Sequence, residues 1–442
     1  MGLGFGPLAD HRPDGQAKTV QRFGLDFGTT NSSLTWVRGE GQVALCDLDP
    51  AAANPHVLRS LLYFSRESRG FVVGRRAIDE YLNEDMHGVL IQSMKTFLAD
   101  NSFEQTWIHD RYYRLEDLIA VIFRHVRATI AALTDDDAFM MIGRPAIFVE
   151  QPERERLAQD RLRKAAHLAG FFDVQFQYEP IAAGLAYEST LRAPAVALIA
   201  DLGGGTSDFT VMRLGADTPG DRREDILATR GVQVGGDTFD ARVMEHRLTK
   251  YFGAGTTHRS MEGHDLPFPR QLLSTLSRWH QIPFLRTPET REFLRRVQRT
   301  SSDPRAVAAF RALIDGNYAF FVFHEIEHAK TLLSDHDEAR IAFARDGIDI
   351  DERLRRDDFE RFIAADQARI ARCMHEVLAS AGVQPADIGA VFLTGGSAQV
   401  PAIRRLFARE FGEERLVAQD YLTTVAFGLG LSAARAEISP EA

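Results

Sequence analysis

The sequence of 442 residues holds only two cysteines, Cys46 and Cys373, and they lie far apart. Two isolated thiols exclude a disulfide framework and a cysteine-built zinc site, and they fit a reducing compartment. Basic residues are outnumbered, with 52 Lys and Arg against 62 Asp and Glu, so the net charge is −10. A chain of this charge has no overall excess of basic residues to attract nucleic acid, and we expect no nucleic-acid partner.

Long apolar runs are missing as well. No segment approaches the roughly 18 apolar residues that a membrane helix needs, so we expect no membrane association. Residues 1–19 have neither the basic start nor the apolar stretch of a signal peptide, and we expect a flexible tail there. These absences together predict a cytoplasmic protein. At roughly 150 residues per domain, the length predicts about three structural units.

Glycine-rich turns follow apolar stretches at three places. In Phe23–Ser33 (FGLDFGTTNSS) and in Ala195–Met212 (AVALIADLGGGTSDFTVM), a β-like stretch ends in Asp and continues through Gly and Thr into another β-like stretch. Each segment predicts a hairpin with a tight turn, and two such hairpins about 175 residues apart indicate two similar lobes. In Val391–Phe407, a predicted strand ends in Gly-Gly-Ser before an amphipathic helix. The alternation of strands and helices predicts an α/β fold.

These turns carry the chemistry of a phosphate site. Backbone N–H groups of a glycine turn can approach a phosphate because no Cβ blocks them. Asp26 and Asp201 would repel a phosphate, so we expect Mg²⁺ and its waters to lie between them. Thr29, Thr30 and Thr206 would donate hydroxyl hydrogen bonds to the terminal phosphates. The sequence has neither GxxxxGK[ST] nor GxGxxG, which argues against P-loop ATPases and Rossmann dehydrogenases.

A competing motif is His324-Glu325-Ile326-Glu327-His328, which matches HExxH. On a helix, His324 and His328 lie one turn apart and could bind zinc, with Glu325 as general base. No extension with further glycine and histidine follows, and no third ligand is evident nearby. We therefore interpret the motif as two histidines on an amphipathic helix and expect no zinc.

The three glycine-rich segments resemble the two phosphate motifs and the adenosine motif of the heat-shock 70-kDa (DnaK-type) chaperone ATPases, a branch of the actin and sugar-kinase superfamily. Tyr178–Glu188, Gly235–Val243 and Gly347–Phe362 resemble further family segments in the same order. The chain most resembles the YegD-type group, short homologues that consist of the ATPase part alone. The resemblance implies a two-lobed, actin-like (ribonuclease H-like) α/β fold with peripheral subdomains that closes over ATP or ADP and Mg²⁺.

The resemblance also assigns roles to individual residues. The metal would be held through water by Asp26, Asp201 and Asp208. Catalysis would rest on Lys95, which reaches the γ-phosphate and positions the attacking water, on Glu179, which orients water or metal, and on Asp201 and Thr206. The nucleotide would be bound by Gly28, Thr29, Thr30, Asn31, Gly203, Gly204, Gly205, Thr206, Gly235, Gly236, Glu327, Lys330, Ser334, Gly395, Gly396 and Ser397. The alternatives are a solvated surface lysine for Lys95 and a carboxylate at a helix start for Glu179.

The helix that contains Glu327, Lys330 and Ser334 resembles the nucleoside-contact helix of the family. Their i, i+3, i+7 spacing predicts that all three lie on one helical face. Two family arginines that sandwich the adenine are replaced by Thr331 and Gln399, and an aspartate near the base aligns with Leu422. These replacements predict weak binding with poor discrimination between ATP and GTP.

The resemblance sets the expected domain boundaries. Lobe I would span residues 20–195 and be closed by a C-terminal helix at residues 423–442, and lobe II would span 196–422. The outer subdomain of lobe II, about 231–345, is longer than in the family, and its insertion at 253–316 would be a protein-partner surface or a cover for the cleft. No interdomain linker or peptide-binding domain follows, so we expect no peptide clamp.

Two classes of function follow from these observations. The first is a chaperone-like, Mg-dependent protein that binds ATP and hydrolyses it with water as nucleophile. The alternative is a nucleotide-sensing protein with negligible hydrolysis whose lobe closure recruits a partner. A sugar kinase shares the fold but would need a carboxylate base beside a sugar pocket, and nothing in the sequence points to one.

Overall fold

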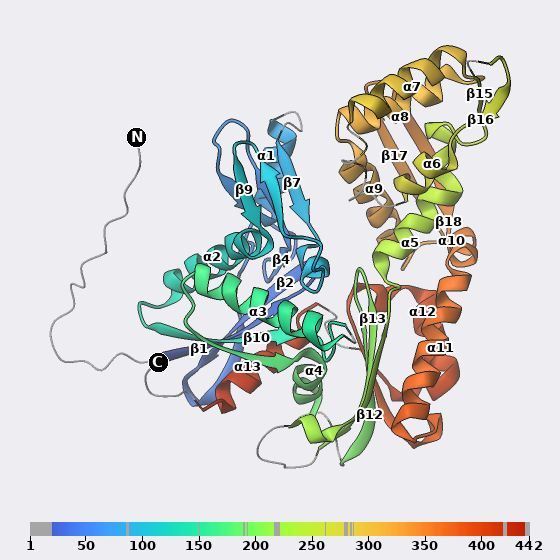
Figure 1. Cartoon of the computed structure of the whole chain (residues 1–442). Coiled ribbons are helices and arrows are strands. Elements are labelled where there is room, and N and C mark those ends of the chain that lie inside the picture. Colours follow the sequence, from blue (N-terminus) through green and yellow to red (C-terminus); the bar gives the residue numbers. More distant parts are fainter. Residues whose placement is uncertain are drawn as a thin grey trace, which may run out of the picture.

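The computed structural model describes residues 20–84, 88–149, 151–188, 191, 193–215, 222–260, 262–277, 282, 285, 287–418 and 422–437. The predicted tail, residues 1–19, lies outside this part of the chain, as do residues 438–442 of the predicted closing segment. Two central sheets, each covered by helices, organise the molecule, and the outer part of each lobe extends to the same end (Figure 1).

The first sheet forms the centre of lobe I. Its strands are β1 (Val20–Phe27), β2 (Asn31–Arg38), β3 (Gln42–Leu45), β4 (Val57–Arg59), β10 (Asp137–Arg144) and β11 (Asp173–Tyr178), in the order β11-β10-β1-β2-β3 with β4 also paired to β2. β1 and β2 form an antiparallel hairpin, whereas β10 and β11 continue the sheet in parallel. The helices α2 (Leu115–Leu133) and α3 (Pro152–Leu168) share an apolar core with Phe23, Leu25 and Phe27 of β1.

The second sheet repeats this arrangement in lobe II. Its strands are β12 (Ala195–Leu202), β13 (Ser207–Leu214), β14 (Ile226–Val232), β19 (Ile388–Thr394) and β20 (Leu416–Ala418), in the order β14-β13-β12-β19-β20. Again the first two strands form an antiparallel hairpin and two parallel strands follow on the other side. This repeated order confirms the predicted two-lobed, actin-like α/β fold. The helices α11 (Ala364–Ala381) and α12 (Pro401–Phe411) cover one face of this sheet (Figure 1).

Between the sheets lies α4 (Glu179–Glu188), which shares one apolar core with both of them (Figure 1). Ile181 and Leu185 of this helix belong to the same cluster as Phe139 of lobe I and Phe392 of lobe II. The ring of Tyr187 stacks on that of Phe392 with centroids 4.0 Å apart. The core between the lobes therefore fixes the first residue of α4, Glu179, near both hairpins.

The helix α13 (Thr424–Arg435) packs against the lobe I sheet although it follows the strands of lobe II. The Arg22 guanidinium donates hydrogen bonds to the carbonyl oxygens of Ala433, Ala434 and Ala436 at 2.6, 3.1 and 2.7 Å. The same helix also packs closely on α4. A Cβ on Gly428 would lie 1.7 Å from the carbonyl oxygen of Ala182, so this approach requires glycine. Arginine at a helix C-terminus also complements the helix dipole.

The outer part of lobe I contains the short strands β5 to β9 and one helix. These elements are β5 (Leu61–Phe64), β6 (Phe71–Val73), α1 (Gly74–Asn83), β7 (Val89–Gln92), β8 (Gln105–Ile108) and β9 (Arg111–Arg114). The outer part of lobe II contains α5 (Gly236–Val243), β15 (Thr257–Arg259), β16 (Asp265–Pro267), α6 (Arg270–Leu276), α7 (Pro288–Thr300), α8 (Pro304–Asp315), α9 (Ala319–Leu332), β17 (Glu338–Arg345), β18 (Ile348–Arg355) and α10 (Arg356–Phe362). The two outer parts touch where the ring of Tyr81 stacks on Phe321, with centroids 5.6 Å apart.

None of the helices in the described residues is by itself long and apolar enough to cross a membrane. The helices α8 and α9 reach that length and composition only as a pair, and they are bent by 100° relative to each other. Their apolar residues, such as Phe310, Leu313 and Ile326, are buried in the core of lobe II.

Candidate functional site

The two predicted phosphate hairpins face each other across the cleft between the lobes. In the first loop (residues 26–31), the N–H of Gly28 donates to the carbonyl of Asn31 at 3.0 Å, and in the second loop (residues 201–206) Gly203 donates to Thr206 at 2.9 Å. A Cβ on Gly204 would lie 2.4 Å from Oγ1 of Thr30. The loops approach this closely because glycine stands at that position.

The second loop also contacts two other predicted segments. The hydroxyl of Ser397, in the third loop (residues 395–397), donates to the carbonyl of Gly203 at 2.8 Å, and the N–H of Gly236 donates to the same carbonyl at 3.1 Å. Gly395 has a φ of +80°, and a Cβ there would lie 2.4 Å from the carbonyl oxygen of Leu202. The fold thus brings three loops and the start of α5 to one place.

Lys95 and Glu179 form a buried ion pair beside the first loop. Lys95 lies in a 3₁₀ turn (Met94–Phe97) that follows Ser93 in the left-handed conformation, with φ of +57°. Its Nζ is 2.7 Å from Oε1 of Glu179, and these side chains are 11% and 9% exposed. Burial alone would lower the pKa of Lys95, but the charges of Glu179 and Asp26 raise it above its usual value. The alternative that Lys95 is a solvated surface lysine is therefore wrong. Glu179 is the first residue of α4, as its alternative of a carboxylate at a helix start predicts.

Three predicted metal-site carboxylates surround this pair and have raised pKa values. Burial and the charge of Glu179 raise the pKa of Asp26 to about 8 and that of Asp201 to about 6. Burial and the charge of Asp201 raise the pKa of Asp208 to about 7, although Thr206 donates a hydrogen bond to it at 2.7 Å. Lys95 lowers all three pKa values without cancelling the repulsion. The centre therefore holds more negative charge than it can stabilise alone.

This donor set fits a hydrated divalent cation. Within the described ranges, no three side chains of His, Cys, Asp or Glu come together closely enough to hold a metal ion by themselves. Mg²⁺ usually keeps several waters and binds through one or two carboxylates and phosphate oxygens, so it does not need such a cage. A cation bound through water by Asp26, Asp201 and Asp208 would lower their pKa values and relieve the repulsion.

The predicted nucleoside helix, α9, differs in part from the expectation. Nζ of Lys330 lies 2.8 Å from Oδ1 of Asp240 and donates to the carbonyl of Gly236 at 3.2 Å, beside the third loop. The helix ends at Leu332, because the chain turns there to enter β17. Ser334 lies in this turn, so the prediction that Glu327, Lys330 and Ser334 share one helical face is wrong for Ser334.

The HExxH motif lies on the same helix. Nδ1 of His324 is 3.8 Å from a carboxylate oxygen of Glu327, and its ring stacks on Phe320 with centroids 6.1 Å apart. His328, one turn further along the same helix, is exposed. The histidines therefore have different surroundings, and the expectation that the motif binds no zinc stays a prediction.

The comparison with known families decides the family of the chain. The model of the Hsp70 protein family matches residues 71–259 and 322–437. This chain belongs to the Hsp70 family. Residues 260–321, which the Hsp70 match leaves out, carry α6, α7 and α8 in the region of the predicted insertion.

Curated relatives are similar to this chain along most of its length. The chaperone protein HscA of Salmonella agona (strain SL483) is 28% identical over 431 residues, and that of Salmonella typhimurium (strain LT2) is 27% identical over 431 residues. Each alignment covers 93% of this Hsp70 chain but 57% of the relative, so the chain spans little more than half the length of these relatives. The YegD-type affinity stays a prediction.

The structure of this Hsp70 member also reveals site residues that sequence reasoning missed. A pocket between the outer parts is lined by Thr29, Thr30, Arg59, Asp237, His324 and Glu327, among others. Arg59 reaches this pocket from lobe I, because β4 pairs with β2 and places Arg59 opposite Asn31. The sequence signal for this residue is an arginine in the short, otherwise apolar strand β4. Its position in the pocket depends on the pairing of β4 with β2, which cannot be read from the sequence.

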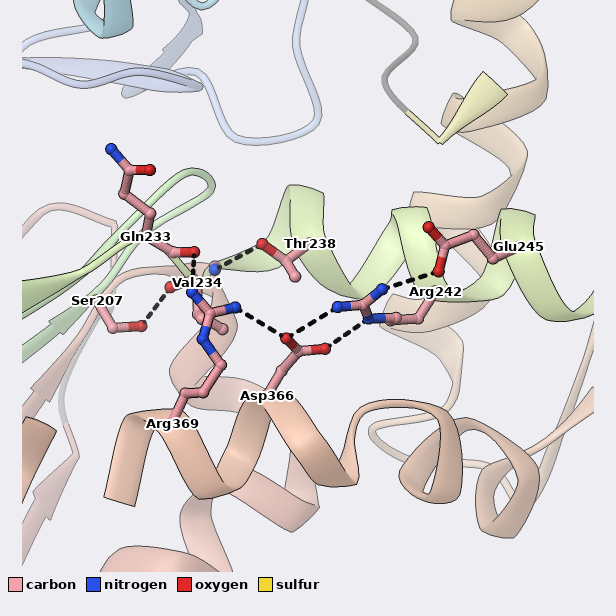
Figure 2. Close-up of polar contacts among 9 residues, drawn as sticks. Ser207, Gln233, Val234, Thr238, Arg242, Glu245, Asp366 and Arg369 are labelled. Atoms are coloured by element: carbon pink, nitrogen blue, oxygen red, sulfur yellow. Dashed lines mark hydrogen bonds and ion pairs between the residues drawn. The ribbon is translucent and has the colours of Figure 1, made fainter. Parts of the chain in front are cut away.

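A second missed feature supports the start of α5. The carboxylate of Asp366 is fully buried in α11 and accepts hydrogen bonds from Nε and Nη2 of Arg242 at 2.7 and 3.2 Å, and from Nη1 of Arg369 at 3.2 Å (Figure 2). Arg369 also donates to the carbonyl of Gln233 at 3.3 Å. Asp366 therefore links α11 to α5 and to the segment that precedes Gly235.

Proposed function

We propose that this Hsp70 member binds Mg·ATP or Mg·ADP between its lobes and hydrolyses ATP. The observation that carries the proposal is the group of three carboxylates with raised pKa values, Asp26, Asp201 and Asp208, beside two touching glycine loops. Such a group needs a cation, and the loops supply the backbone N–H groups that phosphates need. The family match and the relatives that are named chaperones support a chaperone-like role.

Each part of the cleft has a task in this proposal. The loop N–H groups and the hydroxyls of Thr29, Thr30 and Thr206 would hold the phosphates. Bound Mg²⁺ would supply charge neutralisation at the phosphate oxygens. Lys95, held by Glu179, would place its ammonium where charge develops in the transition state, and Glu179 would orient the attacking water. The protein would act mainly through position and electrostatics, as phosphoryl transfer requires.

The nucleoside end of the proposed site has few groups that select a base. Thr331 and Gln399, which stand where the family has arginines, are both exposed. Each missing cation–π face costs about 0.5 to 2 kcal/mol, so two faces cost roughly 10- to 1000-fold in affinity. Other parts of the proposal are a cytoplasmic location, a protein partner at residues 253–316, and no nucleic-acid or membrane partner.

Calorimetric titration tests the proposal. We expect micromolar binding of ATP in the presence of Mg²⁺, with GTP within about tenfold of ATP because Thr331 and Gln399 replace the two stacking arginines of the family. Asp201→Asn should lower the affinity for Mg·ATP at least tenfold. Asp351→Asn is the control and should not change this affinity, because Asp351 forms an exposed pair with Arg340. Absence of heat with the wild-type chain at millimolar nucleotide would contradict the proposal, and binding without single-turnover hydrolysis would favour the nucleotide-sensing alternative.

A further inference from the structure

Arg59 is attached to the first loop by the strand pairing of lobe I. In the register of β2 and β4, Arg59 lies directly opposite Asn31. The next residue, Ser60, donates its N–H to the carbonyl of Thr30 at 2.8 Å. The backbone of Arg59 therefore moves with the first loop, and a rearrangement of one displaces the other.

The side chain of Arg59 crosses the cleft to lobe II. Its Nη1 and Nη2 donate to Oε1 and Oε2 of Glu327 at 3.0 and 2.9 Å, a bidentate arrangement. The side chains are 26% and 31% exposed, so the pair lies at the edge of the cleft and water reaches it. This pair joins the first loop of lobe I to α9 of lobe II.

The guanidinium of Arg59 also lines the pocket that Thr29 and Thr30 line. Asp237 and Asp240, from α5, face the same pocket, and Lys330 compensates the charge of Asp240. Arg59 is thus a positive group among carboxylates, beside the hydroxyls that the proposed function gives to the terminal phosphates. A guanidinium binds a phosphate with the same two-pronged geometry with which it binds a carboxylate.

We propose that Arg59 is a ligand of the terminal phosphate, which it binds in place of Glu327 when a triphosphate is present. The exchange would replace a bond across the cleft by a bond to nucleotide and free the Glu327 carboxylate to accept from the ribose hydroxyls. An arginine supplied by the same chain stabilises charge on a transferring phosphoryl group in other nucleotide hydrolases. The inference rests on the proposed function, because it requires nucleotide in this cleft.

The competing explanation is that Arg59 and Glu327 only hold the lobes together. In that case loss of either side chain changes the binding of diphosphate and triphosphate equally. A ligand of the γ-phosphate changes the dissociation constant of the triphosphate alone, since the diphosphate has no γ-phosphate. The ratio of the two dissociation constants therefore separates the two roles and does not depend on turnover.

The test is competition of a fluorescent nucleotide with Mg·ADP and with the Mg complex of the β,γ-imido analogue of ATP. We expect Arg59→Ala to raise the dissociation constant of the analogue at least tenfold and that of ADP less than threefold, with Arg59→Lys in between. Glu327→Gln should not weaken the binding of the analogue relative to that of ADP, because it leaves Arg59 free to bind phosphate. Arg340→Ala, which removes an arginine from an exposed pair, is the matched control.

Each outcome decides one of the proposals. Equal changes for both nucleotides, or no change in Arg59→Ala, overturn the role of Arg59 while the proposed function stands. Failure of the wild-type chain to bind either nucleotide overturns the proposed function itself. Thermal melting followed by circular dichroism establishes that each variant is folded before binding is compared.

Discussion

The link between Asp366 and Arg242 predicts a large loss of stability when it is broken. Asp366 is fully buried, and its carboxylate accepts three hydrogen bonds from Arg242 and Arg369. Asp366→Ala removes all three acceptor contacts and leaves two arginines facing an empty space. Arg242 keeps Glu245 as a partner at 2.8 Å, so its charge is not wholly uncompensated.

The size of the effect follows from burial. Breaking a buried ion pair by removal of one partner costs about 3 to 5 kcal/mol, and hydrogen bonds to charged groups contribute about 1.5 to 3 kcal/mol each. The side chains of Arg242 and Arg369 are 32% and 46% exposed, so water compensates them in part. We therefore expect the free energy of unfolding to fall by about 2 to 4 kcal/mol, below the sum of the individual bonds.

Urea denaturation followed by circular dichroism measures this loss. Asp366→Asn keeps the shape of the side chain and one oxygen acceptor. We expect its loss of unfolding free energy to be roughly half that of Asp366→Ala. Asp351→Ala is the control, because its pair with Arg340 is exposed and should contribute less than about 1 kcal/mol. If the free energy of unfolding of Asp366→Ala lies within about 0.5 kcal/mol of that of the control, water compensates the charges of the arginines fully and the reasoning from burial is wrong.

Two further predictions concern the charges in the cleft. At pH 7 the carboxyl of Asp26, with a pKa of about 8, is largely protonated without metal. Binding of Mg·ADP should therefore release protons and tighten as the pH rises from 6 to 8, which calorimetry in buffers of different ionisation enthalpy detects; no proton release would contradict the raised pKa. Lys95→Ala should keep nucleotide affinity within a few-fold but lower single-turnover hydrolysis by about tenfold or more, because the ammonium acts on the transition state. Lys164→Ala, which breaks a Lys–Glu pair away from the cleft, should hydrolyse at the wild-type rate, and equal rates for both variants would remove Lys95 from catalysis.

Local patterns allowed much of the fold to be predicted from the sequence. The segments around Asp26 and Asp201 each contain a strand, a glycine turn and a second strand within fewer than 20 residues, so they predict matching hairpins directly. Side-chain partners far apart in the chain escaped prediction. Arg59 pairs with a residue 268 positions away, and Asp366 with one 124 positions away, and no periodicity marks either pair. Ser334 was misplaced for a related reason, because the end of α9 depends on the turn into β17 and not on spacing.

The packing of α13 on β1 has a consequence for synthesis on the ribosome. Arg22 and the carbonyl that it contacts at Ala433 are 411 positions apart, so this layer of lobe I cannot form until residues 424–435 have emerged. All strands of the lobe II sheet lie between residues 195 and 418 and are available earlier. The core that Phe23, Leu25 and Phe27 share with α2 and α3 can form early, but the opposite layer of lobe I is completed last. Until then, the apolar layer that contains Phe139 and Met141 lacks the side chains of α13 that complete it, and such partly covered apolar surface favours misfolding and aggregation.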